Sequence, residues 1–100
     1  MNILDVFPDK DPRTASRIED GEAVVVLLEQ AEVKVLNPVG SRIWELCDGS
    51  IAVRDIIDRI CEEYDVEKNQ ARQDATEFIQ LLADHQMLVL HERPQTDETG

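Results

Sequence analysis

The chain has 100 residues, 42% hydrophobic and 32% charged, a composition typical of one globular domain with a single core. Its 10 basic and 22 acidic residues give a formal net charge of -12, which repels phosphate backbones and disfavours nucleic acid as a partner. No apolar run approaches the roughly 18 residues of a membrane span, and the N-terminus lacks the features of a signal peptide. We therefore expect a cytoplasmic domain that binds neither membrane nor nucleic acid.

The two ends of the chain are predicted to lie outside the domain, which we place at residues 15–91. Residues 1–14 combine two prolines and several charged groups with a few apolar side chains, so we expect a flexible N-terminal arm. Its apolar residues leave docking on the domain or on a partner open. Residues 92–100 contain no apolar side chain, which predicts a disordered tail.

Three short antiparallel strands are predicted in the first half of the domain. Ser16–Glu19 and the β-branched run Ala23–Leu28 flank Asp20-Gly21, a strong turn signal. After a second turn, Glu32–Leu36 alternates valines with charged residues. Ala23–Leu28 is apolar on both faces and suits the centre of a sheet, whereas Glu32–Leu36 has one polar face and suits an edge.

Two helices are predicted next. Asn37-Pro38 is a strong helix start, because Asn accepts hydrogen bonds from free amides at the N-cap and Pro loses nothing at the first helical position. Asp48-Gly49 ends this helix. The second helix has the clearest amphipathic pattern of the chain, formed by Val53, Ile56, Ile57, Ile60, Cys61 and Tyr64.

A third helix is predicted from about Val66 to Asp84, with Asp65 as its N-cap. The stripe expected to face the core consists of Ala71, Ala75, Phe78 and Leu82, with Leu81 beside it. A second, weaker stripe consists of Arg72, Thr76, Ile79 and Ala83. Because Ile79 lies outside the main stripe, we expect it to be available to a ligand and replaceable without unfolding the domain. Met87–Leu90 is predicted as a final strand.

The predicted fold is therefore α+β, with a three-stranded antiparallel sheet followed by three helices and a short C-terminal strand. This order is that of a winged helix-turn-helix. In most such folds the third helix reads DNA with basic and amide side chains. Here it carries four acidic residues, Glu67, Asp74, Glu77 and Asp84, against Lys68 and Arg72, so the charge favours a winged helix adapted to protein partners.

The sequence offers poor material for catalysis or for metal binding. Cys47 and Cys61 fall in helical apolar patterns without a C-x-x-C pair, and His85 and His91 form no metal-binding motif with them. The glycines are isolated, so no phosphate-binding loop is present. We expect no enzymatic activity, no metal and no cofactor.

Residues 20–90 resemble the PqqD family of peptide chaperones. The most specific feature is the combination of Leu36-Asn37, Ile43-Trp44 and Asp48-Gly49 at this spacing, followed by an amphipathic helix. Further matching positions are Asp20-Gly21-Glu22, Val24–Leu28, Gly40, Cys47, Val53, Ile56-Ile57, Tyr64, Phe78 and Leu81-Leu82. One departure is Gln86, which stands where many members have Gly after the third helix.

The resemblance implies a RiPP recognition element, a domain that binds the leader of a ribosomally made precursor peptide. Its implied partner is a modifying enzyme, in many members a radical SAM protein, in pyrroloquinoline quinone biosynthesis or a related peptide pathway. The leader is expected to add as a strand to Glu32, Val33, Lys34, Val35 and Leu36. It is expected to pack on Arg72, Thr76, Ile79 and Ala83 of the third helix.

Two other functions stay open at this point. One is a winged-helix transcription regulator, against which the charge weighs. The other is an interaction module fixed to one enzyme without a peptide ligand. Pairing of the exposed strand with a second copy to form a homodimer also stays open.

Overall fold

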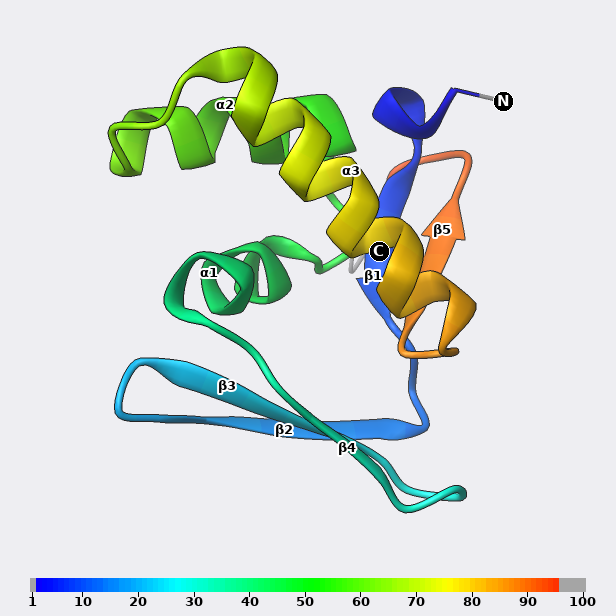
Figure 1. Ribbon diagram of the computed structural model, residues 1–100. Helices are drawn as coiled ribbons and strands as arrows, with labels where there is room; N and C mark the ends of the chain where they lie inside the picture. Colours follow the sequence, from blue (N-terminus) through cyan, green and yellow to red (C-terminus); the bar gives the residue numbers. More distant parts are fainter. Residues whose placement is uncertain (1, 96–100) are drawn as a thin grey trace, which may run out of the picture.

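The computed structural model describes residues 2–95, which form two antiparallel sheets and three α-helices (Figure 1). The elements in chain order are the 3-10 helix η1 (Ile3–Asp5), β1 (Phe7–Lys10), β2 (Thr14–Glu19), β3 (Glu22–Leu27), β4 (Glu32–Val35), α1 (Pro38–Leu46), α2 (Val53–Glu63), α3 (Lys68–Asp84) and β5 (Leu88–His91). The predicted three-stranded sheet, three helices and C-terminal strand are confirmed. No described helix has both the length and the apolarity for crossing a membrane.

The larger sheet has the order β2-β3-β4, with the predicted central strand in its centre. Asp20 and Gly21 join β2 to β3 with φ angles of 54° and 81°, the positive values that a two-residue hairpin turn requires. Ala23, Val25 and Leu27 of β3 are buried on one face. Figure 1 shows the helices on one side of this sheet, so the sheet has one covered face and one open face.

A buried hydroxyl fixes α1 against the end of this sheet. The Oγ atom of Ser41 accepts a hydrogen bond from the amide of Ala23 at 2.6 Å and donates to the carbonyl of Leu36 at 3.1 Å. The Asn37 side chain accepts from the amide of Gly40 at 2.7 Å, as expected of the predicted N-cap. The end of β4 and the start of α1 are therefore held in one place.

The N-terminal segment is part of the fold. In place of the flexible arm expected for residues 1–14, β1 pairs antiparallel with β5. Val6 and Pro8 are buried, and the amide of Gly49 donates to the carbonyl of Pro8 at 2.8 Å. The expectation is wrong for residues 6–10 because their main-chain partners come from distant parts of the chain. Of the tail expected at residues 92–100, residues 96–100 lie outside the described part of the chain.

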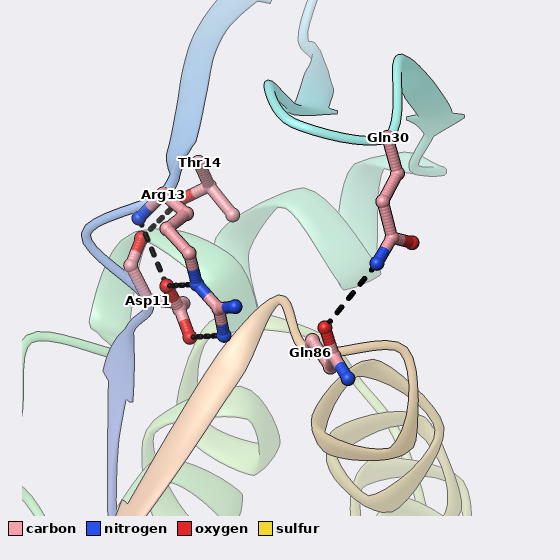
Figure 2. Close-up of polar contacts among 5 residues, drawn as sticks. All are labelled: Asp11, Arg13, Thr14, Gln30 and Gln86. Carbon is pink, nitrogen blue, oxygen red and sulfur yellow. Dashed lines mark hydrogen bonds and ion pairs between the residues drawn. The ribbon is translucent and has the colours of Figure 1, made fainter.

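A buried carboxylate holds the corner between β1 and β2 (Figure 2). The Nε and Nη2 atoms of Arg13 each donate to an oxygen of Asp11 at 2.9 Å, and the hydroxyl of Thr14 donates to the Asp11 carbonyl at 2.7 Å. The amide of Asp11 donates to the carbonyl of Met87 at 3.0 Å, which ties the corner to the segment before β5. The hydrogen bonds from Arg13 lower the pKa of Asp11 from 3.8 to about 2.

The last helix, α3, ends at Asp84 as predicted but starts later than predicted. It begins at Lys68 and its N-cap is Glu67, whose side chain accepts from the amide of Asn69, so Asp65 is not the cap. At the other end Gln86 has a φ of 64°. Its amide and that of the next residue donate to carbonyls of the last helical turn, the geometry in which helices commonly use Gly. The departure at Gln86 therefore leaves the shape of this turn intact.

Candidate functional site

Strand β4 has a free edge. It pairs with β3 on one side, and no strand of the described residues pairs with its other side. The amide of Leu36 donates to the carbonyl of Ala23 at 2.8 Å, and hydrogen-bonding residues alternate along an antiparallel strand. Lys34 therefore faces β3, whereas the N–H and C=O groups of Val33 and Val35 face the open edge. These groups are available to an additional strand.

A groove of about 420 Å³ lies beside this edge, between β4 and α3. Its lining residues are Val33, Lys34, Val35, Leu36 and Asn37 from the strand side and Phe78, Leu81 and Leu82 from the helix. Leu82 is fully buried, Phe78 is half-buried and Leu81 is 47% exposed. The helix thus presents an apolar wall to the free strand edge.

The ring of Phe78 lies close to α1 because Gly40 has no side chain. A Cβ atom at Gly40 would lie 3.1 Å from Cζ of Phe78 and 3.1 Å from Oδ1 of Asn37. On the other side of Phe78 is a second hollow of about 300 Å³ between the helices, which shares Asn37 and Phe78 with the groove. Phe78 therefore forms the boundary between the groove and this second hollow.

Polar contacts join β4 and the turn before it to the residues that follow α3. Nδ1 of His85 lies 2.9 Å from a carboxylate oxygen of Glu32, and Nζ of Lys34 lies 4.0 Å from the same carboxylate. Figure 2 shows the side chain of Gln30 pointing toward Gln86, with 3.5 Å between Nε2 and Oε1. These contacts hold the strand and the helix together at one end of the groove.

The structure brings together the strand part of the predicted site but separates the helix part. Residues 32–36 lie along the free edge as expected. Arg72 lies in a different hollow, with Leu4 and Arg54, and Thr76 lines a further one beside Ile3. Ala83 is half-buried and does not line the groove.

The prediction that Ile79 lies outside the core is wrong, because its side chain is 0% exposed. The core face of α3 consists of Ala71, Ala75, Ile79 and Leu82. Positions three and four residues after Ala75 both lie near the same helix face, so the helical period alone does not choose between Phe78 and Ile79. Phe78 and Leu81 are the helix residues that sequence reasoning misses; the apolar Leu81 beside the main stripe is the signal that points to them.

The chemistry of this site is that of binding. Main-chain groups at an open strand edge, next to apolar side chains, suit an extended peptide. The two cysteines are free. Burial raises the pKa of the Cys47 thiol to about 12, so this thiol is protonated at neutral pH. Among residues 2–95 no group of three or more His, Cys, Asp or Glu side chains is placed to hold a metal ion.

Comparisons with known proteins concern the part of the chain that contains this site. The profile of the family described as coenzyme PQQ synthesis protein D (PqqD) matches residues 22–88. A similar solved structure is TbiB1 in complex with the TbiA(beta) leader peptide, with a TM-score of 0.74, 31% identity and coverage of 80% of this chain and 93% of that chain. Another is lasso peptide synthetase B1 complexed with the leader peptide, with a TM-score of 0.73, 23% identity and coverage of 83% and 98%. No curated protein matches the chain.

Proposed function

This chain belongs to the PqqD family, and we propose that it binds the leader segment of a ribosomally synthesised precursor peptide by adding that segment to β4 as a strand. The observation that carries the proposal is the free edge at Val33 and Val35 beside the groove formed by Phe78 and Leu81. The similar structure at 31% identity holds a leader peptide, which supports the same class of ligand here.

The strand edge and the groove contribute differently to the free energy of binding. Ordering a flexible peptide costs roughly 2 to 5 kcal/mol. The open N–H and C=O groups of Val33 and Val35 each contribute only about 1 kcal/mol net when they form a hydrogen bond. Because these bonds little more than offset the ordering cost, burial of apolar leader residues against Phe78 and Leu81 supplies most of the affinity. The strand sets the direction and register of the peptide.

In this proposal the domain is a recognition protein in the cytoplasm and catalyses no reaction. It presents the bound precursor to a separate modifying enzyme, for which a radical SAM protein is our first candidate. The pathway is pyrroloquinoline quinone biosynthesis or a related peptide natural product pathway. Family membership supports both parts of this proposal.

A leader-binding titration tests the proposal. We expect a fluorescently labelled leader from the cognate precursor to bind with a Kd near or below micromolar, about -8 kcal/mol. Leu81→Glu should weaken binding at least about tenfold, because it places a charge in the apolar wall. Leu81 is 47% exposed, so the fold should survive this change.

The matched control is Ile18→Glu, which changes a residue of similar exposure, 48%, on β2. Fluorescence anisotropy should give the same leader affinity for this variant as for the unaltered chain. Absence of binding by the unaltered chain, or equal loss in both variants, would contradict the proposed site.

A further inference from the structure

The open face of the β2-β3-β4 sheet is apolar. Side chains alternate between faces along a strand, so the residues next to the buried ones on β3 point away from the helices. The register pairs Val24 with Val35 and Val26 with Val33, which makes one block of four valines. Val33 and Val35 are 56% and 63% exposed, and Leu28, which continues the same face, is 60% exposed.

In the described part of the chain nothing covers this face (Figure 1). A shallow hollow of about 250 Å³ beside the valines is lined by Ala15, Ser16, Arg17, Val24 and Val26. Contiguous exposed apolar surface of this kind commonly marks a site of protein association. The covered face of the same sheet already packs on the helices, so the open face is not needed for the core.

The charges around this face identify the kind of partner that fits it. Asp20 and Glu22 lie at one end of the sheet and Glu29 at the other, all exposed. The nearest cations already have acidic partners, since Nε of Arg17 lies 3.2 Å from Glu19 and Nη2 of Arg13 lies 2.9 Å from Asp11. The rim of the apolar face is therefore acidic.

An acidic rim disfavours a second copy of this chain as the occupant. Two copies that met through this face would bring their acidic rims together, and each copy has a formal net charge of -12. The complementary surface is an apolar patch surrounded by Lys and Arg side chains. Such a surface would belong to a different protein.

We propose that this open face, defined by Val24, Val26, Leu28, Val33 and Val35, is the docking surface for the enzyme that acts on the bound precursor. The inference rests on the proposed leader binding. The main-chain groups of Val33 and Val35 lie at the free edge where the leader adds, and their side chains lie on the open face. An added leader strand therefore extends this face, and an enzyme docked there contacts the leader and the domain together.

The test uses two separate binding measurements on the full chain. Leader affinity is measured by anisotropy. Enzyme affinity is measured by biolayer interferometry with the purified enzyme that modifies the cognate precursor, with and without saturating leader. We expect the unaltered chain to bind this enzyme at least about threefold more tightly when leader is present, because the docked surface is then larger.

The variants separate the two surfaces. Leu28→Lys and Val26→Lys should each weaken enzyme binding at least about tenfold, by charge repulsion and loss of apolar contact. Leader affinity should change by less than about threefold, because the added charge points away from the groove. Ile18→Lys, at a similarly exposed position on the opposite face, should leave both affinities unchanged. Circular dichroism confirms that each variant is folded.

The outcomes are distinguishable from those of the leader titration. Equal enzyme affinity in Leu28→Lys, Val26→Lys and Ile18→Lys would overturn the docking surface even if the leader binds. If the unaltered chain binds no leader but the first two variants lose enzyme binding, the docking surface is supported and the proposed function is contradicted. A dimer in light scattering that Val26→Lys converts to a monomer would assign the face to a second copy and overturn the inference.

Discussion

A single buried carboxylate shows how much of this small fold depends on individual residues. Asp11 is 5% exposed and has both of its oxygens bound by Arg13 (Figure 2). A buried charge is tolerated only when it is paired and hydrogen-bonded. Its carbonyl accepts from Thr14 within the β1–β2 corner, and its amide joins this corner to Met87 in the segment before β5. The residue therefore holds the smaller sheet against the larger one.

This ion pair predicts a loss of stability in acid. The folded-state pKa of Asp11 is about 2, below its ordinary value of 3.8. Its contribution is therefore fully present above pH 4 and is lost as the pH falls toward 2, by about 1 to 2 kcal/mol. Urea denaturation at pH 5, 4, 3 and 2 should show a smaller decrease for Asp11→Asn than for the unaltered chain. Asp20→Asn, at an exposed carboxylate, is the control and should keep the full decrease.

At the scale of elements, α3 serves the core and the groove with adjacent residues. Ile79 lies in the core, while Phe78 and Leu81 face the groove. The Ser41 hydroxyl fixes the end of β4 from the other side. The groove therefore has walls whose positions are set by buried contacts, which reduces the entropy lost when a ligand binds.

The two faces of α3 predict a large and a small effect of truncation on stability. Ile79→Ala should lower the free energy of unfolding by about 2 to 5 kcal/mol, because it opens a cavity in the core. Leu81→Ala should lower it by less than about 1 kcal/mol, because this side chain is half exposed already. Chemical denaturation measures both. A larger loss for Leu81→Ala than for Ile79→Ala would show that the helix is rotated from the orientation described.

The free edge of β4 predicts an alternating pattern of amide hydrogen exchange. On saturation with leader, the amides of Val33 and Val35 should gain protection of at least about tenfold, since they become hydrogen-bonded. The amides of Lys34 and Leu36 should change little, because they already bond to β3. NMR exchange rates resolve these four signals. Uniform protection of all four would indicate general stabilisation of the sheet and would contradict strand addition.

At the scale of the whole molecule, the charge selects the class of partner. The formal net charge is -12, and the exposed face of α3 carries Asp74, Glu77 and Asp84 among its acidic residues. In DNA-binding winged helices this helix enters the major groove, which needs basic side chains. The charge therefore disfavours DNA and favours basic surfaces of protein partners, which it attracts over a distance set by the salt concentration.

The acidic charge predicts that the chain does not bind DNA measurably. In a gel shift at about 50 mM salt, where phosphate contacts are strongest, we expect no retarded band with the promoter region of its own gene cluster. A basic winged-helix domain of similar size serves as the positive control. Retardation that depends on sequence and falls steeply with added salt would favour a transcription regulator.

The sequence by itself determined those features of this protein that depend on neighbouring residues. The Asp20-Gly21 turn, the Asn37-Pro38 helix start and the edge character of residues 32–36 each depend on a few neighbouring residues, and each appears where it was predicted. The family resemblance and the acidic charge also needed no coordinates. Together they predict the fold class and one half of the candidate site.

The tertiary structure alone decided the other half. Pairing of β1 with β5 joins residues near opposite ends of the chain, and short stretches of four residues carry too little pattern to reveal a partner. The choice between Phe78 and Ile79 depends on contacts made by both neighbours. Gly40 lets the Phe78 ring lie against α1, and Ile79 is then the residue left to fill the core. Packing decides which of two neighbouring side chains is buried, and it depends on contacts between segments that are distant in the sequence.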